Sequence, residues 1–570
     1  MPSIDTNTNP TNQIESDSNS QMDIDTINTS DSYISSYISN NNVENLNQSK
    51  TQHLNDNDLN IDNNNDDDDE NLDKVLTNLH QTEASKHISR ILSIPEKSDK
   101  KEFTLKNIII LMSTLSVFLT TWGFNASTGI VLNHYLNNNT FPGTSKGTYS
   151  IIACISPFLG QVLCPLAGIL VGTIGYQYTM ALGTILIFLG YILGFVAKNL
   201  GYLYMWAVFT GTGISLSFVP ATTIIPKIFI KNRAFAISTI LIGTGIGAVL
   251  SSIIGSFTNV RIFLLILAII VITLQSASVY CLHRVFVDES FVRKPLTLTL
   301  FWEEFKKYYS IDIFKSYIAH LIGIWFNIAL MGYLIFVFTL SSYTNAVQPD
   351  ITTLDSNLIT VYLNLGQIVG RPLMGRIGDK FGRSNTTILF TSFCAIFIWV
   401  YWLNFTTSYG KIVGFAVLMG ITCGVANVFN TVLIADCCQN YPPEMNMFIK
   451  YWAFVNSNYG PVLLFAEYIV QKLTVTTASN PYRNAQMFSG SLYLFALLLS
   501  FFIREYKVRT LIEGEIKTVE NQLIYETRMY DEKEVKESEQ KLEQKLEKLN
   551  KSNKINIKET IKRTFLPIVV

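Results

Sequence analysis

Two matching segments of sequence, PLMGRIGDKFGR at Pro372–Arg383 and PLAGILVGTIG at Pro165–Gly175, decide how this chain is organised. They align without a gap as P-L-x-G-x-x-x-[G/D]-x-x-G and lie 207 residues apart. Each segment follows a long apolar stretch, so each marks the end of a predicted helix. A single displacement that relates two such helix ends is typical of a duplicated helical half.

Long apolar stretches surround both segments, and each can cross a hydrocarbon core about 30 Å thick at about 1.5 Å per residue. We predict an all-α membrane protein in which twelve transmembrane helices form two six-helix bundles. The first and seventh spans start 208 residues apart, in agreement with the displacement of the repeat. The predicted spans are 107–135, 147–172, 178–197, 201–226, 233–255, 260–282, 315–343, 355–378, 384–404, 408–435, 446–473 and 484–503.

Composition supports a membrane protein with polar tails. Charged residues make up 15% of the 570 residues, well below the roughly 25% of ordinary soluble domains, which argues against a soluble enzyme. Residues 1–100 hold 19 Asp and Glu against 6 Lys and Arg, and such an acidic, apolar-poor segment cannot form a packed core. The predicted parts are a disordered acidic Asn/Asp-rich tail (1–100), a first bundle (101–282), a linker (283–314), a second bundle (315–504) and a charged helical tail (505–570).

The orientation follows from the positive charges in the short loops. If the N-terminus is cytosolic, the inside loops hold roughly twice as many Lys and Arg as the outside loops, which places both tails in the cytosol. Lys231 and Arg233 are interpreted as anchors at the inner end of the fifth span, and Asp436 is placed at the membrane interface. The Glu- and Lys-rich stretch 532–549 favours a solvated helix, because its leucine seam is short for a coiled coil.

The second copy of the repeat predicts a gate between conformations. Gly375 allows close approach of neighbouring helices. Asp379 can cap the positive N-terminal end of the following helix, while Lys380 and Arg383 lie at the cytosolic interface. With Gly382 in the turn, this charged segment can form in one conformation and break in the other. The first copy has Gly172 and Tyr176 at the positions of Asp379 and Arg383, so the gate is expected to be asymmetric.

The stretch 370–384 resembles the loop signature of the major facilitator superfamily. Two further stretches, FIKNRAFA at 229–236 followed by GTGIG at 243–247, and WGFNASTG at 122–129, are similar to the monocarboxylate transporter family and its fungal branch. The resemblance covers about 100–505. It implies a secondary transporter that works by alternating access.

The resemblance also implies a substrate site, with two departures. Animal members of the family use a first-helix Lys together with an Asp and an Arg four residues apart on the eighth helix. Arg371 matches that Arg, Gln367 stands at the Asp position, and the Lys position falls at about Ala126. Arg371 can bind a carboxylate in a bidentate manner, and Gln367 can add a hydrogen bond but cannot relay a proton.

Other polar residues within the apolar spans are candidates for the wall of a substrate cavity, although hydrogen bonds between helices would explain them equally well. They are Asn125, Ser127, Asn327, Asn364, Asn427 and Asn430. Glu467, in the eleventh span, is the remaining candidate for a proton carrier, because its apolar neighbours would favour the neutral acid.

We therefore expect an integral multi-pass membrane protein, more readily of the plasma membrane than of the vacuole, that transports small organic anions of monocarboxylate type, with protons as candidate co-substrates in a symport. Two alternatives remain: a facilitator of a neutral or larger metabolite such as a vitamin, and a non-transporting nutrient sensor that signals through its tails. No cofactor, metal, nucleotide, nucleic acid or obligate protein partner is expected, and there is no Walker-type phosphate-binding sequence.

Overall fold

A computed structural model describes most of the chain beyond the acidic tail. The chain divides into two units, Met1–Lys97 and Ser98–Val570. The first unit, and with it nearly all of the predicted acidic tail, lies outside the described residues. The structure describes residues 102–138, 140–286, 297–308, 315–438, 447–475, 480–529 and 535–553.

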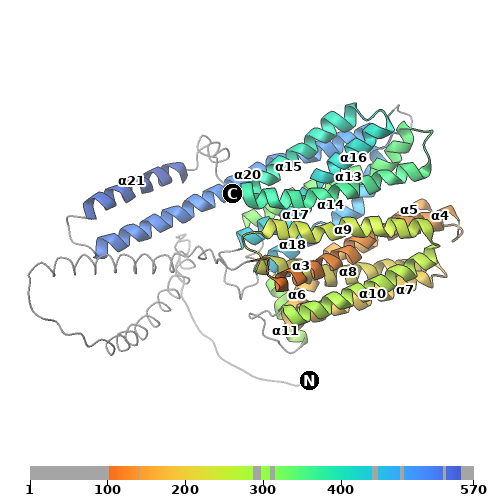
Figure 1. Cartoon of the computed structure of the whole chain (residues 1–570), viewed down its shortest axis with the longest axis horizontal. Helices are drawn as coiled ribbons and strands as arrows, with labels where there is room; N and C mark the ends of the chain where they lie inside the picture. The colour runs from red at the N-terminus through yellow and green to blue at the C-terminus, as the bar shows by residue number, and fades with distance from the viewer. Residues whose placement is uncertain are drawn as a thin grey trace, which may run out of the picture. The chain divides into compact units, whose positions relative to one another are not determined.

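Helices make up the described part of the second unit, which contains no strand. Its first half corresponds to the first six predicted spans (Figure 1). In chain order the helices are α3 (Leu105–Phe118), the π-helical segment η1 (Leu119–Gly123), α4 (Thr128–Asn137), α5 (Lys146–Val162), α6 (Cys164–Ile174), α7 (Tyr176–Phe195), α8 (Leu200–Ile228), α9 (Arg233–Phe257) and α10 (Val260–Val285). A short helix, α11 (Leu298–Tyr308), follows within the predicted linker and packs against α6.

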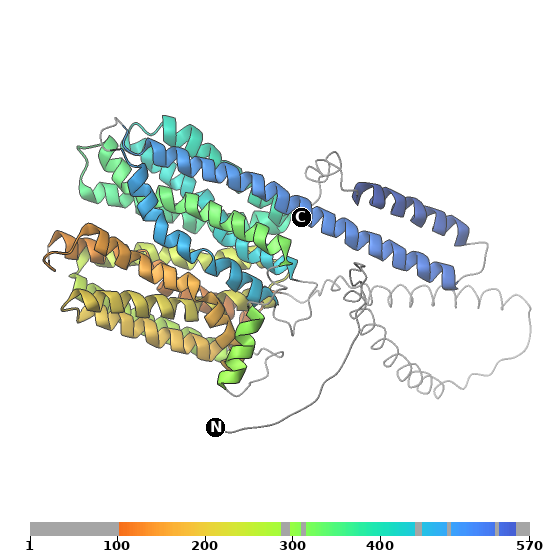
Figure 2. The same ribbon diagram turned by 180° about the vertical axis from the view of Figure 1, so that it is seen from behind.

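The second half corresponds to the other six predicted spans (Figure 2). Its helices are α13 (Tyr317–Val347), α14 (Thr353–Phe381), α15 (Arg383–Ile396) with the π-helical segment η2 (Phe397–Trp402), α16 (Tyr409–Cys423), α17 (Val425–Cys437), α18 (Met447–Ser457), α19 (Gly460–Leu473) and α20 (Arg483–Met529). The last described helix, α21 (Val535–Asn553), lies beyond α20.

Nine helical stretches of the described chain are long and apolar enough to cross a membrane, and α5 with α6, bent by 45°, forms a tenth. The two other predicted spans are also helical, as α14 and as α18 with α19. They are less apolar or shorter than the other spans, for identifiable reasons. Helix α14 carries several charged residues, among them Arg371 and Asp379. The α18–α19 span is interrupted before Pro461. Proline has no backbone N–H, which is tolerated at the start of a helix.

The repeat is visible in the backbone as well as in the sequence. Helix α6 ends at Gly175 with φ +94°, and α14 ends at Gly382 with φ +99°. Both glycines join their helix directly to the next one, α7 or α15. A positive φ is accessible to glycine at little cost and is strained for other residues, so the two matching segments make the same turn in the two halves.

Two pairs of membrane spans make the largest contacts between the halves. Helix α9 packs along α14, and α5 and α6 pack along α19 and α18 (Figure 1). The α9–α14 contact is close, because a Cβ atom at Gly375 would lie 2.5 Å from the carbonyl oxygen of Ala234. Glycine at such a crossing lets two backbones approach within a distance that larger residues forbid. The two halves therefore meet with little space between α9 and α14.

The C-terminal helices differ from the prediction of a solvated tail helix. Helix α20 continues without a break past residue 504, where the second bundle was predicted to end. Leu546 and Leu549 of α21 pack on Val508, Ile512 and Ile516 of α20, and the two helices run side by side (Figure 2). The leucine seam, too short for an extended coiled coil, is long enough to close this helical hairpin.

The first described residue and the exit of α20 lie at the same end of the bundle, which we call the tail-side end. The described chain begins there at Glu102, and α20 leaves the bundle there toward α21 (Figure 1). The opposite end, which holds the start of α5 and the end of α19, is called the far end.

The fold predicts a strong effect of one methyl group at Gly370. A Cβ atom there would lie 2.6 Å from the carbonyl carbon of Ile421 on α16, so Gly370→Ala must separate α14 from α16. We expect a loss of about 1–3 kcal/mol of stability, seen as a lower midpoint of thermal unfolding of the purified protein. Gly410→Ala is the control, because no atom lies within 4 Å of its Cβ position. Equal midpoints for the two variants would contradict this packing.

Candidate functional site

A cavity of about 810 Å³ lies between the two halves. Its wall includes residues of α3, α5, α8 and α9 from the first half, and of α13, α14, α17, α18 and α19 from the second. It extends to Tyr149 near the start of α5 and to Thr474 at the end of α19, so its wall reaches the far end. Aromatic side chains are prominent in this wall, among them Trp122, Phe218 and Trp452.

Six of the eight predicted substrate residues line this cavity, and they come from three helical spans. They are Arg371, Gln367, Asn125, Asn364, Asn427 and Asn430. The two others are not among the described lining residues. The hydroxyl of Ser127 donates to the carbonyl of Phe124 at 2.6 Å, and the Asn327 amide nitrogen donates to the carbonyl of Gly323 at 2.7 Å, so each is held by its own helix.

Arg371 both borders the cavity and joins the two halves. It is 4% exposed. Its Nη1 donates to the carbonyl oxygen of Leu241 and to the hydroxyl of Thr244, both on α9, and its Nη2 donates to Oε1 of Gln367 one turn earlier on α14. Its Nε is buried and has no hydrogen-bond partner among the described residues. The arginine thus bridges the halves and retains one unused donor.

The electrostatics of the cavity are set by this arginine. Among the described residues that line the cavity, Arg371 is the one charged side chain, and the other polar groups are neutral. The described residues also contain no cluster of His, Cys, Asp or Glu that could hold a metal ion. A buried cation without a counter-ion in a cavity of low dielectric attracts an anion strongly, which makes this wall suited to an organic acid.

The predicted proton carrier cannot be placed in the same way. Glu467 belongs to α19, whose backbone the structure describes. Its side chain lies outside the described part of the structure. Its role as a proton carrier remains a prediction.

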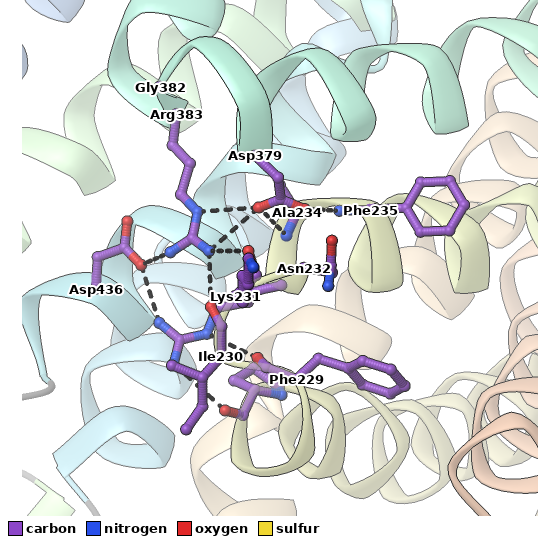
Figure 3. A network of polar contacts seen from close by, with 12 residues as sticks. Phe229, Ile230, Lys231, Asn232, Ala234, Phe235, Asp379, Gly382, Arg383 and Asp436 are labelled. Carbon is purple, nitrogen blue, oxygen red and sulfur yellow. Dashed lines mark hydrogen bonds and ion pairs between the residues drawn. The ribbon is translucent and has the colours of Figure 1, made fainter. Parts of the chain in front are cut away.

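A cluster of ion pairs, the tail-side latch, joins the halves at the tail-side end. It consists of Asp379, Arg383, Asp436, Arg233 and Lys507 (Figure 3 shows most of it). Arg383 lies between the two carboxylates. It pairs with Asp379 at 3.2 Å and also with Asp436, while Arg233 and Lys507 each reach Asp436 at 2.9 Å.

Asp379 caps a different helix from the predicted one. Its carboxylate accepts hydrogen bonds from the backbone N–H groups of Ala234 at 3.1 Å and Phe235 at 2.8 Å. These residues open α9 in the other half, so the prediction that Asp379 caps the following helix, α15, is wrong. A helix N-terminus carries unpaired donors and a partial positive charge, and the close α9–α14 packing brings that of α9 to Asp379.

The predicted gate residues divide into those within the latch and those beside it. Asp379 and Arg383 belong to it, Gly375 permits the packing that forms it, and Gly382 makes the turn that carries Arg383. Lys380 points away from it, with its ammonium 5.2 Å from the ring centre of Phe381.

Arg233 and Asp436 were interpreted as an anchor and an interfacial residue, and both interpretations are incomplete. Arg233 is 4% exposed and is paired with Asp436. The two residues lie 203 positions apart in sequence, so no local pattern could have joined them.

Glu102 binds the turn between α8 and α9 at the tail-side end of the first half. Its carboxylate accepts hydrogen bonds from three successive backbone N–H groups, those of Ile230 at 2.9 Å, Lys231 at 2.7 Å and Asn232 at 2.9 Å, in the turn between α8 and α9. Partial burial acts to raise the pKa of Glu102, but the hydrogen bonds from Lys231 and its neighbours outweigh burial and lower the pKa below the ordinary value of 4.5. Glu102 therefore stays ionised at neutral pH. No sequence motif pointed to it.

Two helical halves around a central cavity, with ion pairs closing one end, define a membrane transporter rather than an enzyme. Comparison with known sequences agrees. Residues 110–460 match the model of the Major Facilitator Superfamily, and the chain belongs to this family.

Several curated relatives are transporters. The chain is 38% identical over 469 residues to the uncharacterized transporter ESBP6 of Saccharomyces cerevisiae, covering 80% of this chain and 68% of the relative. It is 25% identical to the probable transporter MCH2 of the same yeast, over 70% of this chain and 82% of the relative. Human monocarboxylate transporter 14 is 25% identical over 25% of this chain and 28% of its own length. The resemblance to the fungal branch of the monocarboxylate transporters is thereby confirmed.

The latch predicts that the loss of the positive charge of Arg383 and that of Lys380 have different effects. Arg383→Gln removes the cation that Asp379 and Asp436 share. Breaking a buried ion pair costs roughly 3–5 kcal/mol, so the closed arrangement of the tail-side end becomes less stable and the end should open more often. Cys437 and Cys438 line a cavity beside the latch. We expect a maleimide added from that side to label them at least about tenfold faster, as measured by mass spectrometry.

Lys380→Gln is the matched control for Arg383→Gln, because Lys380 lies in the same segment and is exposed. It should leave the labelling rate unchanged. Cys394, which is buried in the second half, serves as the internal reference. Equal labelling of the Arg383 and Lys380 variants would refute the latch.

Glu102 predicts a pH dependence of definite sign. A carboxylate whose pKa is lowered by folding stabilises the fold above its ordinary pKa and loses this effect as the pH falls through the lowered value. Glu102→Gln should therefore lower the thermal midpoint by a constant amount between about pH 6 and pH 8, and by less below pH 4.5. A difference that grows on acidification would show that Glu102 is not held in its ionised form.

Proposed function

We propose that this transporter carries small organic anions of monocarboxylate type by alternating access. The observation that carries the proposal is the cavity whose single described charge, Arg371, has an unpaired Nε. A charged group without a counter-ion in a membrane protein is costly and marks a functional site by default. A carboxylate supplies the missing charge and the missing acceptor together.

The free edge of the guanidinium indicates how a carboxylate binds. Nη1 is occupied by the two acceptors on α9, Leu241 and Thr244, whereas Nε is unpaired and Nη2 has one partner, Gln367. A carboxylate can therefore approach the edge formed by Nε and Nη2 and accept two parallel hydrogen bonds. Arginine suits this role because its donors form a rigid fork.

The same arginine couples the substrate to the movement of the halves. Because Nη1 holds α9 while Nε and Nη2 hold the carboxylate, the substrate binds at a contact that must change when the halves move. A ligand shifts such an equilibrium only by its difference in affinity for the two states. The bridging contacts of Arg371 supply that difference.

The described conformation is closed at the tail-side end and has a cavity whose wall reaches the far end. In the orientation favoured by the loop charges, the tail-side end and both termini are cytosolic, and the cavity faces outward. The plasma membrane is the favoured location. Passage of the substrate to the cytosol then requires the tail-side latch to break.

Proton coupling finds little support in the cavity. Gln367 stands where an acid would relay a proton, and no Asp or Glu is among the described lining residues. A facilitator of a larger metabolite is therefore a second candidate. The cavity volume of about 810 Å³ favours it, since it lies in the upper part of the range typical of drug-sized ligands.

Arg371→Gln tests the substrate site. The substitution keeps hydrogen-bonding capacity but removes the charge, so uptake of labelled carboxylates into proteoliposomes should fall at least about a hundredfold, as expected when a charged hydrogen bond of about 3 kcal/mol is lost. Arg376→Gln is the control, since Arg376 lies on the same helix but is exposed. Arg371 would not be a substrate ligand if its variant transported carboxylates as fast as the Arg376 variant does.

A further inference from the structure

A second buried polar atom without a partner among the described residues belongs to a cavity-lining residue of α17. Asn430 is 2% exposed and lines the cavity wall. Its Oδ1 is buried and has no hydrogen-bond partner within the described structure. A buried acceptor without a hydrogen bond destabilises the protein relative to an acceptor hydrated by water. A ligand that donates a hydrogen bond to this oxygen removes that cost and therefore binds more tightly.

The two unpaired atoms lie at different levels of α17, one beside its start and one on the helix itself. A Cβ atom at Gly424, which precedes α17, would lie 3.3 Å from Nε of Arg371, so the free edge of the guanidinium lies beside Gly424. Asn430 follows six residues later, which corresponds to about 9 Å along the helix axis. Asp436 of the latch follows after six more residues. Asn430 therefore lies between Arg371 and the tail-side latch, at the inner end of the cavity.

An aromatic wall adjoins Asn430. Trp452 donates from its indole nitrogen to the hydroxyl of Thr431 at 2.9 Å, which holds the ring beside the residue that follows Asn430. Its ring packs edge to face on Phe218 at 5.5 Å, and Phe218 packs in the same way on Trp122 at 5.4 Å. All three rings line the cavity. Such surfaces bind flat apolar bodies through burial and edge-to-face contacts.

We infer that the site selects an elongated aromatic carboxylate with a hydrogen-bond donor at the end opposite the carboxyl group. The carboxylate binds to Nε and Nη2 of Arg371, the ring lies against the aromatic wall, and a hydroxyl or amine donates to Oδ1 of Asn430. This inference rests on the proposed function and adds the class of substrate. Short hydroxy acids reach Arg371 but cannot span the distance to Asn430.

The test compares two pairs of unlabelled competitors against uptake of one labelled aromatic carboxylate, using the full-length protein in proteoliposomes. The long pair is 3-(4-hydroxyphenyl)propanoate and 3-phenylpropanoate, and the short pair is lactate and propanoate. The hydroxylated member of the long pair should compete at least about tenfold better, the effect expected of one hydrogen bond to a buried unpaired acceptor. The short pair should show no comparable preference.

Asn430→Leu identifies the residue responsible. This variant removes the acceptor at similar volume, so the preference within the long pair should disappear. Asn327→Leu is the matched control: among the described residues, Asn327 also has a buried Oδ1 without a partner but is not part of the cavity lining. It should keep the preference.

The outcomes separate this inference from the proposed function. Competition by both long carboxylates without a preference, or a preference that persists in Asn430→Leu, overturns the role of Asn430 and leaves carboxylate transport standing. A preference confined to the short pair overturns the spacing argument. If no carboxylate competes at all, the proposed function itself fails. The comparison on the unmodified protein decides the matter even if Asn430→Leu does not fold.

Discussion

The close packing of α9 on α14 is the constraint on which the other features depend. Gly375 allows the two backbones to approach at the tail-side end, and this approach places the N-terminus of α9 within reach of Asp379. Further along the same contact, Arg371 reaches the carbonyl oxygen of Leu241. This helix pair therefore carries Arg371 and two residues of the latch, Asp379 and Arg233, so a change in its packing affects both places.

The buried charges are arranged in two contrasting ways along this interface. At the latch, Asp436 is surrounded by three cations, and each buried charge has a partner that offsets its loss of hydration. At the cavity, Arg371 is held by neutral oxygen atoms and by no carboxylate within the described part of the chain. The first arrangement stabilises one conformation, while the second leaves a charge that an anion can neutralise. This difference suits a gate and a binding site respectively.

Much of the fold followed from the sequence, because hydropathy and the repeat are local signals. All twelve predicted spans are helical, and both halves turn at matching glycines, Gly175 and Gly382. The extended helix α20 departs from the prediction, since apolarity alone does not define where a helix continues into water. The helical hairpin with α21 depends on contacts between distant leucine and isoleucine residues, which the short leucine seam only hinted at.

The candidate site was predictable in its residue types but less so in its contacts. Polar residues within apolar spans correctly identified six residues of the cavity wall, yet Ser127 and Asn327 show that such a residue can be satisfied by its own helix. The motif identified Asp379 and Arg383, but their partners belong to helices far away in sequence. Glu102, Arg233 and Lys507 lie at the latch or beside it only because the two halves and the tail meet there.

The most direct test is a structure of the protein determined by electron cryomicroscopy with 3-phenylpropanoate bound. The carboxylate is expected within hydrogen-bonding distance, about 3 Å, of Nε and Nη2 of Arg371, with Nη1 still directed at α9. A ligand bound elsewhere in the cavity, with Arg371 keeping its present contacts and its Nε unpaired, would contradict the view that this arginine both binds the substrate and joins the two halves.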